Sequence, residues 1–118
     1  MYAERHVVAV TTAADGSATV YTDGPVTGRV ASVSYLKTDF ADGVDFTITV
    51  EDTGQSLWTD TNINASETVY PVQPANLGAS GAASTLSEVR VAVANSRIKI
   101  VIAQGGNAKT GAFHIVME

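Results

Sequence analysis

The stretch Val44–Glu51, with the sequence VDFTITVE, decides the fold class of this chain. Every second residue from Val44 to Val50 is apolar, and the residues between them are Asp or Thr. A period of two places alternate side chains on opposite faces of an extended strand. The stretch therefore predicts a β-strand with one face in a core and the other exposed to solvent or paired with a partner.

Turn-forming residues divide the rest of the chain into short β-prone runs. The runs are rich in Val, Ile, Thr, Tyr and Phe, and the turn signals between them are Asp15-Gly16, Asp23-Gly24-Pro25, Asp42-Gly43, Thr53-Gly54, Asn95-Ser96 and Gly105-Gly106-Asn107. Short strands at roughly 8–12-residue spacing are typical of an all-β sandwich or barrel. We expect one domain over residues 1–118, an antiparallel, jelly-roll-like β-sandwich of about eight strands with one long loop. An immunoglobulin-like sandwich is the alternative if two of the runs are not strands.

Some of these signals also predict which strands are neighbours. Asp15-Gly16 predicts a hairpin between the first two strands, and Asn95-Ser96 predicts a tight hairpin between the strands that flank it. Thr53-Gly54 predicts the turn that leads out of the Val44–Glu51 strand. Gly28 lies inside the long run Val26–Lys37, whose period is ambiguous, and is interpreted as a β-bulge.

Residues 71–84 form a gap in the series of turns. The segment holds Pro71, Pro74, Gly78 and Gly81 among small residues, which is the composition of a loop. A loop of this length is long for a compact domain, and such loops are usually functional. A short helical turn over residues 82–86 is an alternative for its last part. We expect contact with a neighbouring protein to involve this segment first.

The composition is that of a domain with few charges. Charged residues make up 16% of the 118 residues and the net charge is −5, whereas about 25% is typical of soluble domains. Because charges are depleted at interface cores, this composition suits contact with other proteins, although a Ser/Thr-rich β surface alone would explain it. The acidic balance argues against nucleic-acid partners. No apolar run reaches the about 20 residues of a membrane helix, and the lack of cysteine favours assembly in a reducing cytoplasm.

Three aspartates form the strongest candidate for a metal site. Asp39, Asp42 and Asp45 place carboxylates at every third position beside Gly43, and carboxylate oxygens are the ligands that Ca²⁺ prefers. The spacing does not match an EF-hand loop. A solvated turn that leads into a strand explains the same pattern, so we expect no metal and no other cofactor.

The residues also give no recognisable catalytic motif. His6 and His114 lie in no nucleophile elbow or zinc-protease pattern, and His114 alternates with apolar Phe113 and Ile115, so we expect it to face outward. The segment Gln104–Lys109 is glycine-rich, as phosphate loops are, but lacks their Gly-Lys-Ser/Thr signature. We therefore expect no catalytic or cofactor-binding residues and no enzyme activity.

Aromatic residues leave carbohydrate binding open as an alternative. Trp58, with Tyr21, Tyr35 and Tyr70, is a candidate platform for stacking on sugar rings. A single Trp in a small sandwich belongs more often to a core or an interface.

Two segments near the C-terminus resemble small virion proteins of tailed bacteriophages. They are Asn95–Ala103 (NSRIKIVIA) and Gly105–Phe113 (GGNAKTGAF), and the earlier Tyr21–Gly24 and Asp42–Ile48 fit the same pattern. The resemblance implies a decoration or cement protein that binds the outside of the major capsid lattice and stabilises the head. It also implies a place on the capsid exterior after synthesis in the host cytoplasm, with dimers or trimers at capsid symmetry axes. A head–tail connector or a tail component is the alternative.

Overall fold

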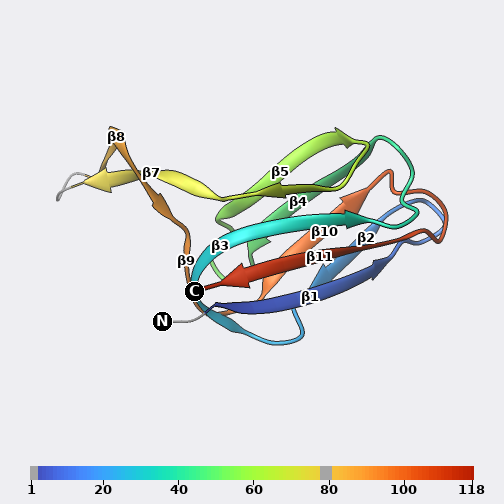
Figure 1. The fold of residues 1–118 in the computed structure, drawn as a ribbon, viewed down its shortest axis with the longest axis horizontal. Coiled ribbons are helices and arrows are strands. Elements are labelled where there is room, and N and C mark those ends of the chain that lie inside the picture. Colours follow the sequence, from blue (N-terminus) through green and yellow to red (C-terminus); the bar gives the residue numbers. More distant parts are fainter. Residues whose placement is uncertain (1–2, 78–80) are drawn as a thin grey trace.

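Two antiparallel β-sheets packed face to face make up most of the molecule (Figure 1). The computed structural model describes residues 3–77 and 81–118, and these residues contain no helix, so no helix among them could cross a membrane. The all-β antiparallel sandwich predicted from the sequence is confirmed. The strands are β1 (Glu4–Thr11), β2 (Ala18–Tyr21), β3 (Val26–Lys37), β4 (Val44–Val50), β5 (Ser56–Ile63), β6 (Glu67–Val69), β7 (Val72–Leu77), β8 (Ala82–Arg90), β9 (Ala92–Ser96), β10 (Ile98–Ala103) and β11 (Thr110–Met117).

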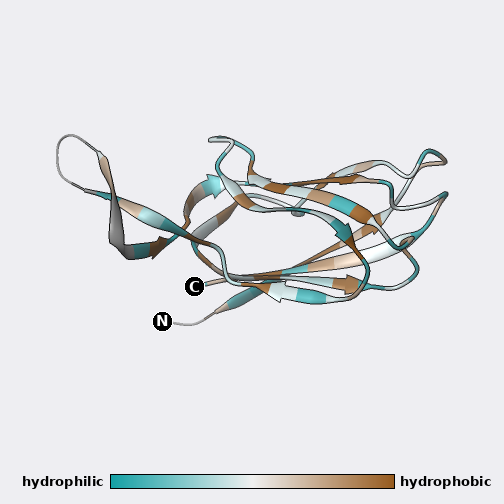
Figure 2. Cartoon of the chain, turned by 90° about the horizontal axis from the view of Figure 1, so that it is seen from above, coloured by the Kyte–Doolittle hydropathy of each residue, from teal (hydrophilic) through white to brown (hydrophobic). Residues whose placement is uncertain are grey.

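The strand order is that of a jelly-roll-like sandwich. One sheet has the order β1-β11-β3-β6 and the other has the order β2-β10-β4-β5. β9 pairs with β3 on the same side as β6, and β7 and β8 pair only with each other. Figure 2 shows the two layers one above the other, with hydrophobic residues recurring along the strands of both. Nine of the described strands thus form the two sheets, and β7 and β8 form a separate pair between β6 and β9.

β4 shows how the sequence pattern produces this core. Its four apolar residues, Val44, Phe46, Ile48 and Val50, are at most 2% exposed, while Thr47 between them is exposed. β10 lies beside β4 in continuous register and buries Ile98, Ile100 and Ile102 in the same way. The predicted alternation is therefore confirmed for this strand.

An aromatic cluster fills the centre of the sandwich. The ring of Phe46 lies 4.9 Å from that of Tyr35, 5.0 Å from Trp58 and 5.1 Å from Phe113, centre to centre, in edge-to-face arrangements. Tyr35 is fully buried, and its hydroxyl has no hydrogen-bond partner among the described residues. Burial raises the pKa of Tyr35 to about 12, and the negative charge of Asp42 adds to the shift.

β3 contains two irregularities. Its pairing with β11 skips Ala31, because Val116 faces Ser32 and Met117 faces Val30. A second shift, in the pairing with β9, lies between Val26 and Gly28. The extra residue is on β9, where Ala94 and Asn95 stand opposite Thr27, so the bulge predicted at Gly28 lies on the partner strand. The first bulge changes the parity of the buried residues, which explains the ambiguous period of this run.

Turn signals predicted some neighbours correctly and others wrongly. Thr53-Gly54 joins β4 to its neighbour β5, as expected, with Gly54 N donating to Val50 O at 2.8 Å. The hairpins predicted at Asp15-Gly16 and Asn95-Ser96 are wrong, because β1 and β2 lie in different sheets, and so do β9 and β10. Asn95 has a positive φ of 51°, but it lies inside β9, at the register shift of the pairing with β3. Turn-forming residues act on the local backbone, whereas the partner of each strand is set by core burial.

The predicted loop over residues 71–84 is also wrong where the structure describes it. Val72–Leu77 forms β7, and residues 82–84, expected to be loop or helical turn, begin β8. Residues 78–80 of the predicted loop lie outside the described residues. The β7–β8 ladder contains a shift between Pro74 and Asn76. Pro lacks a backbone N–H, so this composition interrupts a strand pair without preventing it.

Candidate functional site

The strands β7 and β8, here called the arm, project from one end of the sandwich (Figure 1). The whole molecule measures 48 × 27 × 22 Å, and the arm lies along its longest dimension. The start of β1 and the end of β11 lie at the same end of the sandwich, as both views show.

Apolar side chains are exposed at the arm. Val72 in β7 is 45% exposed, Val89 in β8 is 51% exposed, and Tyr70 just before β7 is 64% exposed. Val72 lies opposite Arg90, and Val89 lies opposite Gln73, so the two valines are on opposite faces of the arm. Both faces therefore offer apolar surface to water.

Charges are scarce along the same part of the chain. Between Thr68 and Ser96 the charged residues are Glu88 and Arg90. The side chain of Arg90 turns toward the sandwich, where its Nη1 donates to Ala31 O at 2.8 Å and its Nε lies 3.8 Å from Glu118 Oε1. An apolar, charge-poor surface of this kind is typical of the centre of a protein interface.

A few contacts fix the base of the arm. Val30 N donates to Val91 O at 3.0 Å, and the Val91 side chain is 2% exposed. Gln55 Nε2 donates to Gln73 Oε1 at 2.8 Å, which ties β7 to the turn before β5. Arg90 completes the base by binding the carbonyl of Ala31, the residue that bulges from β3. The arm thus leaves the sandwich in a defined direction.

Two strands alone give the arm little stability of its own. An isolated two-stranded hairpin is marginally stable in water, because it lacks a third strand or a packed face. The exposed valines and Tyr70 would be removed from water by a partner that packs on the arm. The arm is therefore the part of the described chain best suited to binding another protein.

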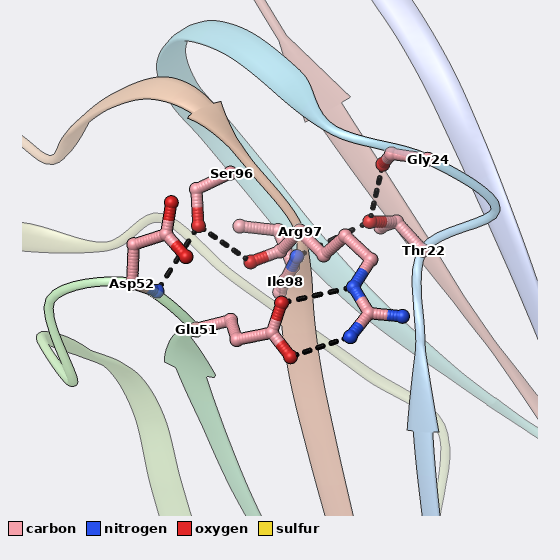
Figure 3. A network of polar contacts seen from close by, with 7 residues as sticks. All are labelled: Thr22, Gly24, Glu51, Asp52, Ser96, Arg97 and Ile98. Carbon is pink, nitrogen blue, oxygen red and sulfur yellow. Dashed lines mark hydrogen bonds and ion pairs between the residues drawn. The ribbon is translucent and has the colours of Figure 1, made fainter.

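A polar network holds the crossing from β9 to β10, between the two sheets (Figure 3). The buried Ser96 Oγ accepts from Asp52 N and donates to Arg97 O, both at 3.1 Å. Thr22 Oγ1 accepts from Ile98 N at 3.1 Å. The same hydroxyl donates to Gly24 O at 2.9 Å. These bonds satisfy backbone groups where β9 leaves one sheet and β10 enters the other.

An ion pair completes this network. Arg97 binds Glu51 with two parallel bonds, Nε to Oε1 at 2.9 Å and Nη2 to Oε2 at 2.6 Å (Figure 3). Its guanidinium lies 4.0 Å from the centre of the Tyr21 ring. The bonds from Arg97 hold the pKa of Glu51 below its ordinary value and raise the pKa of Arg97. The network is structural, since each group is used in joining β2, β4 and β10.

The three aspartates considered for Ca²⁺ have separate partners. Asp39 Oδ1 accepts from the Thr110 hydroxyl at 2.9 Å and from Thr110 N, which lowers the pKa of Asp39. Asp42 pairs with Lys37. Asp45 accepts from the Asn62 backbone and from the Gln104 side chain. The described residues contain no cluster of three or more metal-binding side chains.

The histidines are not brought together. His6 belongs to the inner-face series of β1 and its Nε2 lies 3.6 Å from Glu4 Oε2. His114 lies on the outer face of β11, between the buried Phe113 and Ile115, as expected.

The glycine-rich segment Gln104–Lys109 is occupied by internal bonds. Gly105 N donates to Gly16 O at 2.9 Å, and Lys109 N donates to Thr12 Oγ1 at 2.9 Å. Thr12 Oγ1 in turn donates to Gly106 O at 2.6 Å. The segment therefore serves as a link between the β1–β2 and β10–β11 connections, not as an anion cradle.

The aromatic platform for sugars is not assembled. Trp58 is 8% exposed and packs on Phe46 within the core, and Tyr35 is fully buried. Tyr70 is exposed beside the arm. Tyr21 lies elsewhere in the chain, and the guanidinium of Arg97 covers its ring.

One surface depression of about 310 Å³ lies over consecutive residues 62–67. Two of its polar side chains are already used: Asn64 Oδ1 accepts from Gly43 N at 2.7 Å, and Ser66 Oγ accepts from Lys37 N at 2.9 Å.

Sequence reasoning singled out residues 71–84, which contribute to the arm, but predicted a loop where the structure has two paired strands. The missing signal was Val72 and Val89, which carry the strand propensity of β7 and β8 on either side of a Pro- and Gly-rich centre. Pro71 and Pro74 hid this signal because proline argues against a central strand.

Comparisons with known proteins show likeness in fold alone. No protein-family model and no curated protein matches the chain. A chain of the cyanophage Pam1 capsid asymmetric unit aligns with TM-score 0.50 and 15% identity, covering 98% of this chain and 80% of that one. A chain of the Bacillus endospore appendages, described as disulfide-linked pili, aligns with TM-score 0.40 and 21% identity, over 98% and 83%. A chain of the virus-like particle of extra small virus from the prawn Macrobrachium rosenbergii gives TM-score 0.39 and 10% identity, over 98% and 78%. The first likeness shows a shared fold, and the scores of the other two support no argument.

Proposed function

We propose that this chain is a bacteriophage virion structural protein, a decoration or cement protein that binds the outside of the major capsid lattice and stabilises the head. In this proposal the arm is the contact with the lattice, and the protein catalyses no reaction. The single observation that carries the proposal is the arm itself, a projecting, charge-poor pair of strands with exposed apolar side chains on both faces.

The fold supports this function. Its overall arrangement is shared with a chain of the cyanophage Pam1 capsid asymmetric unit, since the alignment covers 98% of this chain and 80% of that one. A protein that binds only the assembled lattice stabilises it by mass action and needs no catalytic group. A rigid sandwich with one projecting arm meets that requirement.

The contact chemistry follows from the arm. Burial of Val72 and Val89 against the capsid protein would contribute roughly 25 cal/mol for each Å² of apolar area removed from water. Val91 and Arg90 hold the base, so the arm loses little conformational freedom when it binds. The interaction is expected to depend weakly on salt, since few charges take part.

The test separates heads from tails by sedimentation, using particles assembled with and without the chain. We expect the chain in the DNA-filled head fraction, at a stoichiometry that matches the lattice, and we expect heads without it to release DNA at lower temperature. Presence only in the tail fraction, or a single ring of copies per particle, would contradict the proposal and indicate a tail component or a head–tail connector.

Arm variants make the test specific. The double variant Val72→Ser and Val89→Ser should weaken binding to heads that lack the chain by about tenfold or more, because two apolar contacts are lost. Leu36→Ser is the matched control: Leu36 is 41% exposed but lies on the outer face of β3. If Leu36→Ser weakens binding to heads as much as the double variant does, the arm is not the contact with the lattice.

A further inference from the structure

The outer edge of β1 differs from the other strand edges that the structure describes. β1 pairs with β11 over eight consecutive residues, from Glu4↔Met117 to Thr11↔Thr110, without a register shift. It ends its sheet, so its second edge has no partner strand among the described residues. The strand contains no proline and no glycine. A long regular edge of this kind is a template for pairing with another strand.

Each of the other edges is short or interrupted. β2 has four residues, β6 has three and β9 has five. β5 has eight residues, but its pairing with β4 shifts twice and Asn62 adopts a positive φ of 57°. The β7–β8 pairing contains Pro74 and a register shift. Short strands, bulges and proline are the features by which proteins protect sheet edges. β1 lacks them.

The hydrogen-bond pattern identifies the groups on this open edge. Thr12 N donates to Lys109 O at 2.9 Å, so this pair is a hydrogen-bonded one, and bonded pairs alternate along an antiparallel ladder. Thr110 O accepts from Asp39 N, on the β3 side, which confirms that the pair Thr11↔Thr110 is not bonded between β1 and β11. The backbone N–H and C=O groups that point to the open edge therefore belong to Arg5, Val7, Ala9 and Thr11.

The side chains of these four residues are exposed as well. The apolar side chain of Val7 is 56% exposed and lies on the outer face of the sheet. Arg5 and the neighbouring Glu4 are the charged residues of the strand, and both lie at its beginning. The remainder of the edge is therefore uncharged, and nothing in the side chains opposes the approach of another strand.

We propose that two copies of this chain pair through this edge, β1 against β1, antiparallel about a two-fold axis near Val8. In this register Arg5 lies opposite Thr11 of the second copy and Val7 lies opposite Ala9. All four open-edge residues then form hydrogen-bonded pairs, and the sheets of the two copies join into one continuous sheet.

The charged residues of β1 do not oppose this pairing with a second copy. Antiparallel pairing places the charged beginning of each β1 against the uncharged end of the other, so Arg5 faces Thr11 and like charges do not meet. The two-fold symmetry makes the contact isologous and closed, which limits the assembly to a dimer. The dimer does not depend on the proposed capsid role, because it forms through the edge of β1 and not through the exposed valines of the arm.

The first test is the mass of the purified full chain by sedimentation velocity over a wide range of concentration, for wild type, Val7→Pro and Val7→Thr. Proline at position 7 removes an N–H that points to the open edge and leaves the bonds to β11 intact. We expect a concentration-dependent dimer for wild type and Val7→Thr. In Val7→Pro the dissociation constant of the dimer should rise about tenfold or more. A wild-type chain that is monomeric throughout, or a dimer that Val7→Pro leaves unchanged, would overturn the proposal.

Retained fold is checked separately. The near-ultraviolet circular dichroism of Trp58, buried in the core, should be the same in the three proteins. Should Val7→Pro fail to fold, Val7→Lys introduces an exposed charge at the same edge and is measured in its place, with the same weakened dimer expected.

The second test addresses the register, and the absence of cysteine in the chain makes it clean. One preparation carries Val7→Cys and another Ala9→Cys. The proposed register brings these two positions together, at a separation that a disulfide accepts. Mild oxidation should cross-link the mixture more than either preparation alone. Cross-linking of Val7→Cys with itself in preference to the mixture, or yields no higher than those of Thr47→Cys on the other sheet, would contradict the register.

Discussion

At the scale of single residues, Tyr35 combines tight packing with an unused polar group. Its ring contacts Phe46 and Phe113 in the centre of the sandwich, while its hydroxyl is buried without a partner among the described residues. Burying a hydroxyl without a hydrogen bond costs free energy, whereas the ring contributes apolar burial. The ring of Tyr35 therefore stabilises the fold, whereas its unpaired hydroxyl destabilises it.

We predict that Tyr35→Phe raises the free energy of unfolding by about 1 kcal/mol, because the ring stays and the unpaired hydroxyl is removed. Denaturant unfolding followed by Trp58 fluorescence measures the change. Tyr70→Phe, at an exposed position, is the control and should leave stability unchanged. A loss of stability in Tyr35→Phe would mean that the hydroxyl is hydrogen-bonded.

The pH dependence of the same residue has a definite sign. The pKa of Tyr35 is raised to about 12 in the folded chain, so the phenol is easier to ionise after unfolding. Its contribution to stability is complete below about pH 10 and is lost as the pH rises toward 12. The alkaline loss of stability should therefore be smaller in Tyr35→Phe than in the wild type.

Glu51 should control part of the acid sensitivity. Its pKa is lowered by the bonds from Arg97, so its stabilising contribution is present above its ordinary pKa and is lost as the pH falls through the folded value. Thermal unfolding measured from neutral to acid pH should show a shallower acid decline in Glu51→Gln. Glu88→Gln, in the arm, is the control. Parallel acid declines for wild type and Glu51→Gln would refute the role of this pair.

At the scale of elements, two irregular positions of β3, Ala31 and Gly28, determine how the arm and the end of the chain attach. Ala31 offers its carbonyl to Arg90 because it is displaced from the ladder. Gly28, with φ 131°, lets the chain approach Glu118, where a Cβ on Gly28 would lie 2.7 Å from Glu118 O. Arg29 and Glu118 then exchange two backbone bonds of 2.9 Å each.

Gly28→Ala should destabilise the fold by about 2 kcal/mol, since it adds both backbone strain and a steric conflict with Glu118 O. Gly24→Ala is the matched control, because a Cβ at Gly24 meets nothing within 4 Å. Chemical denaturation of the two variants gives the comparison. Similar stabilities of the two would show that the backbone at Gly28 can relax without cost.

Elements were predictable where pattern and partner are both local. The strict alternation of apolar and polar residues predicted β4, and the Thr53-Gly54 turn predicted that β5 lies beside it. Asn95 has a positive φ but lies inside β9, and β9 and β10 enter different sheets, a crossing that the predicted turn residues do not encode. The candidate site followed the same rule: composition singled out this segment, while the attachment of the arm uses contacts of Arg90 with Ala31 and Glu118, which lie far from it in the sequence.

At the scale of the whole molecule, the protein has two distinct ends. The arm, the start of β1 and the end of β11 share one end, and the β10–β11 connection lies at the other (Figure 1). If the arm meets the capsid lattice, the opposite end faces away from it.

This polarity predicts the effect of bulky labels. Coupling a large group to cysteine at Asn107→Cys, in the exposed β10–β11 connection, should leave binding to heads unchanged. The same group at Ala83→Cys, exposed in the arm, should prevent binding. Co-sedimentation of each labelled protein with heads is the measurement, with the unlabelled cysteine variants as controls. The reverse result would mean that the end with the β10–β11 connection, and not the arm, contacts the lattice.

The place where the arm is inserted has a consequence for variation. β6 pairs with β3 at Val33–Tyr35, and β9 returns to the same edge of β3 at Val26–Arg29. The connection between them leaves and rejoins a single strand, so its length can change without moving any other part of the sandwich. Insertions, deletions and wholesale replacement should be tolerated at this junction more readily than at any turn that spans the two sheets. The same sandwich could in this way acquire a new binding specificity when the segment between β6 and β9 is exchanged for another.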